Sequence, residues 1–320
     1  MNARRAAILV TALLASCTHV IVPERPLPPR RSAHDDRRAP DRRPIEDQHA
    51  ALRLGTPSPA AGAALCRRLQ RLVETHRWNM NACPDGLEWR QVGVSALGEP
   101  LLIAELGTVD APLSVLVLSM VHPDEMTPLH ATLMLLNRLA SAPPTGVRVV
   151  VAPLVNPDGL WRKEPSRSNA RGVDLNRNFP ATDWAPTRHL PWKGKLIADL
   201  RRFPGDRPAT EPETLFQMAL VTMLRPHRIV TLHAPWGLLD YDGPEVGLER
   251  AALAREAMRS FMRIRKRPRA HGRVSGSLGS WAGRDHGIPC YTVELPSSHP
   301  YDGPRFTPAF WAAFEVLVTP

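Results

Sequence analysis

The chain has 320 residues, of which 43 % are hydrophobic, so it is long enough for one large folded domain or two small ones. Its formal net charge of +10 would suit an acidic partner such as nucleic acid, an anionic lipid surface or an anionic wall polymer. The arginines are scattered over the whole chain, with no recognisable nucleic-acid-binding motif and no basic helix interleaved with aromatic residues. We therefore expect no nucleic-acid partner.

The N-terminus has the features of an export signal. Arg4 and Arg5 precede an apolar run from Ala6 to Ala15, which is too short to span a bilayer, and small residues then lead to Cys17. The segment Leu-Ala-Ser-Cys resembles the lipobox of bacterial lipoproteins, in which the cysteine becomes the lipidated first residue of the mature protein. We predict a signal peptide at residues 1–16 and a membrane anchor on Cys17, with a soluble exported protein as the alternative.

The residues after Cys17 predict where the protein is located in the cell and a disordered segment that follows the anchor. In lipoproteins an aspartate directly after the cysteine favours retention at the inner membrane, and here Thr18 follows. We therefore expect the cell envelope as the location, with the lipid anchor in the outer membrane facing the periplasm. Residues 17–62 are rich in proline and arginine and have no sustained period, which indicates a disordered tether. Residues 63–320 are predicted to form the folded domain.

Cysteine usage agrees with export. An oxidising compartment makes a disulfide between Cys66 and Cys83 plausible. Cys290 would then remain as a buried free thiol inside an apolar run. The sequence leaves the other pairings open.

From about residue 63 onward, short apolar runs alternate with helical patterns. The predicted strands are Trp89–Val94, Leu101–Leu106, Ser114–Met120, Val147–Ala152, Ile229–Leu232 and Cys290–Leu295. The predicted helices are Leu65–His76, Pro128–Leu139, Glu211–Leu224, Leu248–Met262 and Pro308–Val318. This alternation predicts an α/β fold with a mixed, mainly parallel sheet flanked by helices. Functional sites in such folds gather at the carboxyl ends of the strands.

Two of these strand ends carry residues that can bind a metal. After Ser114–Met120, His122 and Glu125 lie three residues apart in a turn that runs into a helix, so both can reach one ion. The strand Ile229–Leu232 is followed by His233, which would complete a set of two histidines and one glutamate with a fourth position open for water. The alternative is that His122 caps the helix and His233 is a hydrogen-bonded core histidine.

A third strand end carries Glu294. A lone acid in the apolar strand Cys290–Leu295 is costly unless it is paired or functional. Beside the attacking water, it could act as a general base and pass the proton to a leaving amine. An exposed residue on an edge strand is the alternative.

The segment Arg167 to Pro180 reads RSNARGVDLNRNFP and combines three arginines with three asparagines and Asp174. Guanidinium groups offer a fixed fork of donors that suits a carboxylate or an oxyanion, and asparagine both donates and accepts. The composition indicates an anion-binding loop, with a solvated basic loop as the alternative.

Together, the segments HPDE, NPDG and R-x-N-x-x-G-V-D-L-N-R-N-F, with a strand-terminal His and Glu, resemble the M14 zinc carboxypeptidase family in residues and in order. The resemblance runs from about Leu101 to Pro300. The sequences SNARGVDLNRNFP, TEPET at Thr210–Thr214 and GSLGSW at Gly276–Trp281 are most similar to the murein peptide amidase branch. Those enzymes cleave the amide between γ-D-glutamate and diaminopimelate in peptidoglycan peptides, a substrate that a periplasmic lipoprotein would meet.

The resemblance implies one zinc ion, held by His122, Glu125 and His233, and Glu294 as general base and acid. It gives Arg167 the role of stabilising the tetrahedral oxyanion, where one positioned donor typically supplies about 3 kcal/mol.

The same resemblance assigns Asn176 and Arg177 to the clamp on the terminal carboxylate of the substrate, which makes the family exo-acting. Asp174 would orient the loop or a neighbouring metal ligand. Arg171 and Asn178 are expected to be scaffold.

The sequence departs from the family at one point. Digestive carboxypeptidases place a mobile tyrosine some twenty residues before the catalytic glutamate, and the span from His271 to Trp281 contains none. His271 or Tyr241 could replace it, or substrate capture does not need that group. Side-chain specificity is expected from the Tyr241–Gly247 loop and the Gly276–Trp281 turn.

The sequence thus predicts a zinc-dependent amidase that hydrolyses a C-terminal amide bond of peptidoglycan peptides. A general zinc carboxypeptidase acting on α-linked peptides is the alternative among enzymes. A wall-binding lipoprotein on a degenerate peptidase fold is the alternative of another class, and it predicts the loss of an essential residue. None is missing from the sequence.

Overall fold

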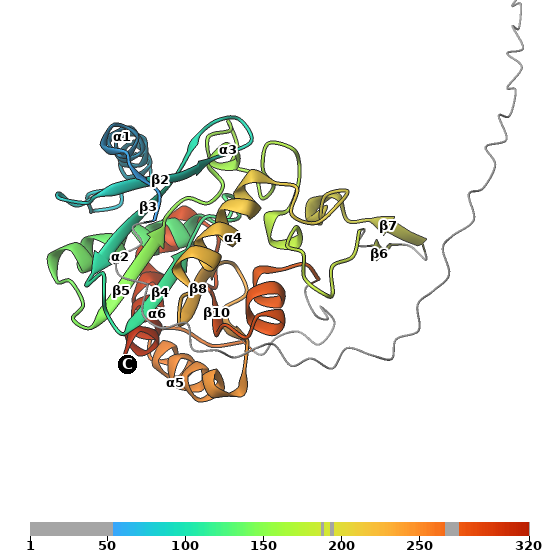
Figure 1. Ribbon diagram of the computed structural model, residues 1–320. Coiled ribbons are helices and arrows are strands. Elements are labelled where there is room, and N and C mark those ends of the chain that lie inside the picture. The colour runs from blue at the N-terminus through green and yellow to red at the C-terminus, as the bar shows by residue number, and fades with distance from the viewer. Residues whose placement is uncertain (1–53, 187–188, 193–194, 266–274, 320) are drawn as a thin grey trace, which may run out of the picture. The chain divides into compact units, whose positions relative to one another are not determined.

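The computed structural model describes residues 54–186, 189–192, 195–265 and 275–319 (Figure 1). The predicted signal peptide, Cys17 and most of the predicted tether lie outside the described residues, and so does His271. No helix within the described ranges is long and apolar enough to cross a membrane.

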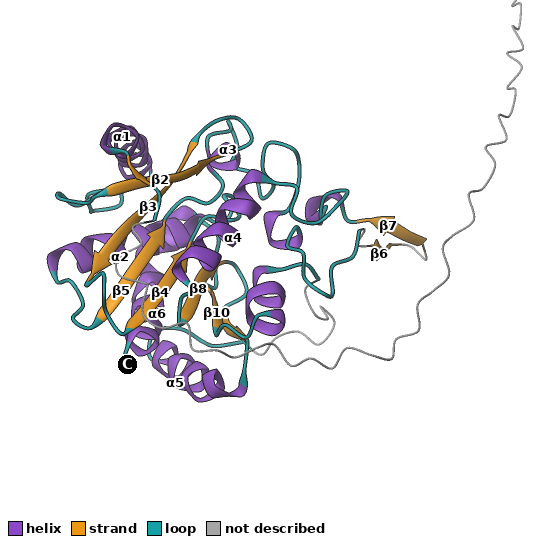
Figure 2. Cartoon of the chain, in the orientation of Figure 1, coloured by secondary structure: helices purple, strands orange, loops and turns teal. Residues whose placement is uncertain are grey.

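A mixed eight-stranded sheet forms the centre of the described part, with the strand order β1-β2-β3-β5-β4-β8-β10-β9 (Figure 2). The strands are β1 (Thr56–Pro57), β2 (Trp89–Val94), β3 (Pro100–Gly107), β4 (Leu113–Leu118), β5 (Val147–Ala152), β8 (Arg228–His233), β9 (Leu238–Asp242) and β10 (Cys290–Glu294). β5, β4, β8 and β10 are parallel to one another, and the outer strands on both sides pair antiparallel. The prediction of a mixed α/β sheet is confirmed, with parallel pairing confined to its four central strands.

The helices are α1 (Pro59–Thr75), α2 (Met126–Ser141), α3 (Pro157–Leu160), α4 (Pro212–Leu224), α5 (Leu248–Arg259) and α6 (Gly303–Val318). A separate antiparallel pair is formed by β6 (His189–Trp192) and β7 (Lys195–Ala198). A π-helical segment covers Gly279–Asp285, and a 3-10 turn covers Leu175–Arg177.

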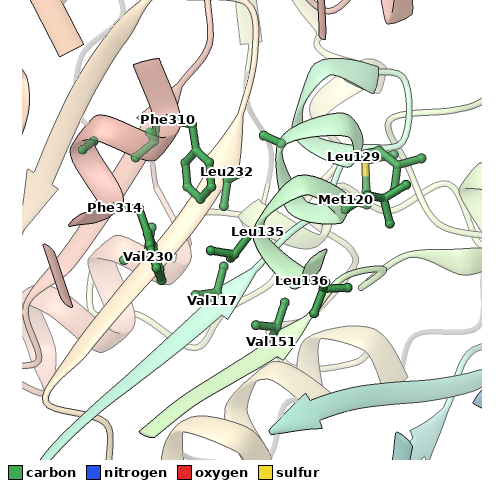
Figure 3. Close-up of a cluster of buried hydrophobic side chains, with 14 of the residues drawn as sticks. Val117, Met120, Leu129, Leu135, Leu136, Val151, Val230, Leu232, Phe310 and Phe314 are labelled. Carbon is green, nitrogen blue, oxygen red and sulfur yellow. The ribbon is translucent and has the colours of Figure 1, made fainter. Parts of the chain in front are cut away.

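The central strands are buried on both faces, as expected for parallel strands covered by helices. Along β4, Val115 and Val117 belong to the core cluster under α2, α5 and α6, whereas Leu116 and Leu118 belong to the cluster under α4. Figure 3 shows the first of these clusters, where Phe310 of α6 and side chains of α2 pack on the valines of the sheet. This alternation means that neighbouring residues of one strand point to different layers.

Several element boundaries differ from those expected. Regular structure begins before residue 63, because β1 pairs with β2 and α1 starts at Pro59, with the preceding Leu54 buried. The last helix starts at Gly303 and contains Pro308, which had been expected as its first residue. The strand β9 and the β6–β7 pair were not predicted.

The disulfide is confirmed. Cys66 of α1 is bonded to Cys83, with a Cα–Cα distance of 5.7 Å. Cys290 is a buried free thiol, and burial holds the pKa of that thiol well above its usual range.

Candidate active site

Three strand ends come together at one edge of the parallel part of the sheet. His122 follows β4, His233 is the last residue of β8, and Glu294 is the last residue of β10. β8 and β10 run in parallel register with Glu294 opposite His233. Because the carboxyl ends of parallel strands meet at one edge, the fold brings these residues together from distant parts of the chain.

His122, Glu125 and His233 form the metal cluster, and each is at most 4 % exposed. Nδ1 of His122 lies 3.1 Å from Oε1 of Glu125 and 3.0 Å from Nδ1 of His233, which lies 3.1 Å from Oε2 of Glu125. One ligand atom of each residue lies within 4.8 Å of the others. Two facing ring nitrogens compete for one proton, whereas a cation between them would satisfy both nitrogens and the carboxylate.

Asp174 holds the ring of His122. Nε2 of His122 donates to Oδ1 of Asp174 at 2.9 Å, so in the neutral ring Nδ1 keeps its lone pair for the cluster. Burial alone would raise the pKa of the Asp174 carboxyl, but Arg167 and His122 outweigh it and hold the pKa well below its usual range. The imidazoles of His122 and His233 and the carboxylate of Glu125 are suitable ligands for a zinc ion. The carboxylate of Asp174, hydrogen-bonded to the far side of the His122 ring, is typical of such sites.

Arg167 lies against the metal cluster from the loop side. Its Nε donates to Oδ2 of Asp174 at 2.9 Å, and its Nη1 donates to Oε1 of Glu125 at 3.0 Å. The side chain is only 11 % exposed and lines the same pocket as the metal cluster. A fixed guanidinium is therefore present where negative charge would develop.

Glu294 lines this pocket as well, next to His233 on the neighbouring strand. The backbone N–H of Trp236 points at its Oε2 from 3.5 Å. Burial raises the pKa of the Glu294 carboxyl to about 7, which suits a group that must both accept and release a proton near neutral pH.

Asn176 and Arg177 line the pocket from the 3-10 turn of the loop. Asp174 caps this turn, because its Oδ1 accepts from the N–H of Asn176 at 3.1 Å. Oδ1 of Asn176 accepts from the N–H of Leu278 at 2.9 Å, and Nη1 of Arg177 donates to the carbonyl of Asn176 at 2.6 Å. The structure thus brings all seven residues singled out from the sequence into one pocket.

A second group of buried polar residues supports the loop from behind. We call Asn169, Glu211 and Glu213 the support cluster, because Nδ2 of Asn169 donates to Glu211 at 2.7 Å and to Glu213 at 2.9 Å. Oδ1 of Asn169 in turn accepts from the N–H groups of Arg171 and Val173. All three members of the cluster are at most 3 % exposed. The TEPET motif therefore holds the Arg167–Pro180 loop in place.

Asn178 is scaffold as expected, since it is fully buried and its Nδ2 donates to the carbonyls of Pro204 and Arg207. Tyr241 lies opposite Tyr291 of β10, and their rings contact each other at a tilt of 42°, away from the face that carries Glu294. Tyr241 therefore does not replace the mobile tyrosine in this structure.

Other lining residues were not identified from the sequence. They are Asp124, Arg201, Arg202, Thr231, Ala234, Pro235, Trp236, Leu238, Asp240, Arg284, Thr292 and Ser298. Of the two segments expected to set specificity, Ser277–Gly279 and Asp242 reach the pocket. The alternation of apolar residues with aspartates along Leu239–Asp242 was the available signal for an edge strand with one polar face.

The fold and the site together are those of a zinc-dependent hydrolase built on an α/β sheet. Comparison with known proteins agrees, because the profile of the zinc carboxypeptidase family matches residues 77–241, which include the three residues of the metal cluster. The chain belongs to this family, M14, and is a zinc-dependent hydrolase.

Curated relatives of the chain include bacterial murein peptide amidases, and solved structures that share its fold include an animal protein. Murein peptide amidase A of Escherichia coli K12 is 31 % identical over 227 residues, which are 70 % of this chain and 87 % of that protein. The crystal structure of murein-tripeptide amidase MpaA from Escherichia coli O157 aligns with a TM-score of 0.55 and 28 % identity, over 75 % of this chain and 94 % of that one. Bovine thrombin-activatable fibrinolysis inhibitor shares the fold, with a TM-score of 0.61 at 16 % identity over 80 % of this chain and 95 % of that one.

Proposed function

We propose that the protein is a zinc-dependent amidase that removes the C-terminal residue of peptidoglycan peptides, by cleaving the γ-D-glutamyl-diaminopimelate bond. The observation that carries this proposal is the meeting of three groups in one pocket: a metal cluster, a carboxyl group with a raised pKa, and a pair of residues suited to a free carboxylate. The named activity of the bacterial relatives supports the choice of substrate.

His122, Glu125 and His233 would hold the ion. Zinc supplies a Lewis acid there, which lowers the pKa of water and polarises the scissile carbonyl. Glu294 takes a proton from the attacking water and delivers it to the nitrogen of the leaving amine. A carboxyl pKa of about 7 lets the same group perform both transfers without a large penalty in either direction.

Arg167 donates to the oxygen that becomes negative when the carbonyl is attacked. Its guanidinium is already fixed by Glu125 and Asp174, so little reorganisation is needed during the reaction. One such donor is typically worth about 3 kcal/mol of transition-state stabilisation. Because Arg167 also holds a metal ligand, its removal would affect zinc binding too.

Asn176 and Arg177 bind the free carboxylate of the terminal residue. A guanidinium and an amide supply several donors to one carboxylate, and charge-assisted hydrogen bonds of this kind are strong and directional. Their position in the pocket with Glu294 limits hydrolysis to the last amide bond of a chain. A substrate with a blocked terminus would lose these contacts.

Hydrolysis of defined peptides tests the proposal. We expect zinc-loaded protein to cleave L-alanyl-γ-D-glutamyl-diaminopimelate and to leave both its C-terminal amide and an α-linked tripeptide largely intact. The Glu294→Gln variant should retain zinc and lose roughly 10²–10⁴-fold in kcat. Glu256→Gln, which changes an exposed glutamate of α5, serves as the matched control and should hydrolyse at the wild-type rate.

Two results would contradict this assignment. Cleavage of α-linked peptides alone would identify a general carboxypeptidase. A Glu294→Gln variant that is as fast as wild type would exclude Glu294 as the base. Zinc content is measured in each preparation, so that loss of metal is not mistaken for loss of the proton acceptor.

We also propose that the protein is anchored through lipidated Cys17 in the outer membrane, facing the periplasm. The support for this is the sequence of residues 1–18, with its short apolar run and lipobox. The wild-type protein should fractionate with outer membranes and carry acyl chains on its N-terminal cysteine by mass spectrometry. A Cys17→Ser variant that remains equally membrane-bound would argue against the lipid anchor.

A further inference from the structure

The segment that follows β10 leads from the active site to α6. We call residues 296–302 the return loop; it begins two residues after Glu294, and its Ser298 lines the pocket. The carbonyl of Ser298 accepts from the N–H of Met126 at 3.0 Å. Met126 is the first residue of α2 and directly follows Glu125 of the metal cluster. The return loop therefore holds the start of α2 beside the metal cluster.

Side-chain hydrogen bonds make the return loop a compact unit. The hydroxyl of Thr127 on α2 donates to the carbonyl of Ser297, which is a second link to the start of this helix. The hydroxyl of Ser297 donates to Oδ2 of Asp302 at 2.6 Å, and its oxygen accepts from the N–H of His299 at 3.1 Å. Because the two ends of the loop are joined in this way, a shift of its outer part is passed to the residues that contact α2.

Trp78 contacts both the return loop and α2. Its indole N–H donates to the carbonyl of Pro300 at 2.9 Å, and the residue is only 4 % exposed. The same ring meets the ring of His130 edge-on, with the ring centroids 5.0 Å apart. His130 lies four residues after Met126, about one turn further along α2. One buried side chain thus joins the return loop to the first turns of the helix that begins at the metal cluster.

The disulfide encloses Trp78 in a covalent ring. Cys66 lies on α1 and Cys83 lies 17 residues later, so their bond joins α1 to the turn that follows it. Arg77, the residue before Trp78, has a φ of 54°, a left-handed backbone conformation that is uncommon for residues other than glycine. A covalent link across this turn restricts the conformations that it can adopt, and so limits where Trp78 can lie relative to α1.

We infer that Trp78 is a positioning residue of the active site and that the Cys66–Cys83 disulfide keeps it in place. Through Pro300, Trp78 holds the return loop against the start of α2, and the return loop in turn holds Glu125 where the metal cluster needs it. The folded protein therefore reaches its full zinc affinity only when the disulfide is closed. This inference goes beyond the proposed function, because it does not depend on which bond is cleaved.

A disulfide that only stabilised the fold would behave differently. Its removal would lower the free energy of unfolding, and the molecules that remained folded would bind zinc as before. A positioning role changes the folded state itself, so zinc affinity falls even where every molecule is folded. Zinc affinity is therefore measured by competition with a chelator, under conditions in which urea unfolding shows each variant to be folded.

Hydrogen exchange of the metal-free protein tests the link without zinc or substrate. In Trp78→Phe the aromatic ring can still pack on His130, but the carbonyl of Pro300 loses its donor. We expect the amide of Met126 to exchange about threefold to tenfold faster than in the wild type, the range for the loss of one hydrogen bond. Zinc affinity of the same variant should fall about tenfold, the lower end for loss of an outer partner of a metal ligand.

A double-mutant cycle shows whether the disulfide acts through Trp78. Cys66→Ser/Cys83→Ser removes the disulfide, and this variant should also lose about tenfold in zinc affinity. Because removal of the disulfide and Trp78→Phe release the same loop, their combination should lose less than the product of the two separate losses.

Trp89→Phe is the matched control. Trp89 is also a buried tryptophan, and it packs against Gly62 of α1, where an added Cβ would lie 2.2 Å from its ring. This variant should loosen the packing of α1 and lower the free energy of unfolding. Its zinc affinity and the exchange of the Met126 amide should equal those of the wild type.

Four outcomes would overturn the inference. Wild-type zinc affinity in Trp78→Phe or in the disulfide-free variant would exclude a positioning role, and so would unchanged exchange at Met126. Separate losses that multiply fully in the combined variant would exclude the route from the disulfide through Trp78. Losses of the same size in Trp89→Phe would mean that any loosening of α1 disturbs the metal cluster.

Discussion

Two clusters of buried carboxylates flank the Arg167–Pro180 loop, and they are built in different ways. In the metal cluster, the carboxylate of Glu125 meets two histidine nitrogens that face each other at 3.0 Å. In the support cluster, each short contact joins a defined donor to an acceptor. Nδ2 of Asn169 donates to both Glu211 and Glu213. Glu211 also accepts a hydrogen bond from the hydroxyl of Thr210, and Glu213 accepts one from the backbone N–H of Ala96.

The two clusters also differ in charge. Burial raises the pKa of both Glu125 and Glu213, but at Glu125 the histidines outweigh burial and lower the pKa below its ordinary value. At Glu213 burial prevails, because its partners are neutral amide groups, and the pKa is raised. A site in which acceptors and charges converge is suited to bind a cation, whereas matched donors and acceptors indicate a structural role.

Replacing one glutamate in each cluster should give the largest contrast. We expect Glu125→Gln to lower zinc affinity by more than about a hundredfold, the upper end for loss of an outer partner, because a direct ligand is removed. Glu213→Gln should keep zinc and lose about 1–3 kcal/mol of unfolding free energy, since its new amide N–H₂ faces a donor of Asn169 or Ala96. Zinc affinity is measured by competition with a chelator, and stability by urea unfolding.

The contrast would fail if both variants lost zinc to a similar extent, because the support cluster would then be inseparable from the metal cluster. It would fail equally if Glu125→Gln bound zinc as tightly as wild type. Unfolding of the metal-free proteins separates a general loss of structure from a specific loss of the ligand.

Asp174→Asn should have an intermediate effect. Asp174 contacts no ion itself, but it accepts from Nε2 of His122 and from Arg167. An asparagine can present its amide to the ring and favour the wrong tautomer, so we expect zinc affinity to fall about 10–100-fold. Asp158→Asn is the matched control, because Asp158 is also buried and accepts from the hydroxyl of Ser95 and the N–H of Leu97 instead.

Asp158→Asn should lose stability and keep its zinc affinity. A fall in affinity of the same size in both variants would mean that any buried aspartate near the loop affects the metal. The specific role of Asp174 would then be lost.

The metal cluster could be predicted from the sequence because its signals are local. His122 and Glu125 lie in one turn, His233 and Glu294 each end a short apolar run, and the order of the segments matches one family. The support cluster could not be predicted in this way. TEPET was recognised only as a motif, since its contact with Asn169 spans more than forty residues and depends on where α4 packs.

The edge strand β9 was missed for a similar reason. This strand has only five residues and begins at Leu238, shortly after β8 ends at His233. It becomes a strand only by pairing with β10, some fifty residues later in the chain. Without β9, the row of Leu238, Asp240 and Asp242 along the edge of β10 could not be seen. The early start of α1 was missed because residues 54–62 are rich in small residues and proline, and their order comes from packing against β2.

The pH dependence of stability gives the smallest effect and the sharpest test of the difference between the clusters. Because the pKa of Glu213 is raised above its ordinary value of 4.5, the folded protein holds this proton more tightly than the unfolded chain does. Its contribution to the unfolding free energy is therefore fully present below the unfolded pKa and is lost as the pH rises through the folded pKa. Glu213→Gln removes this titration. Measured by urea unfolding in chelator, the stability of wild type relative to the variant should fall as the pH rises above about 4.5. A relative stability that rises with pH would mean that the folded protein favours the ionised carboxylate of Glu213, as it does that of Glu125. The proposed electrostatic difference between the two clusters would then be wrong.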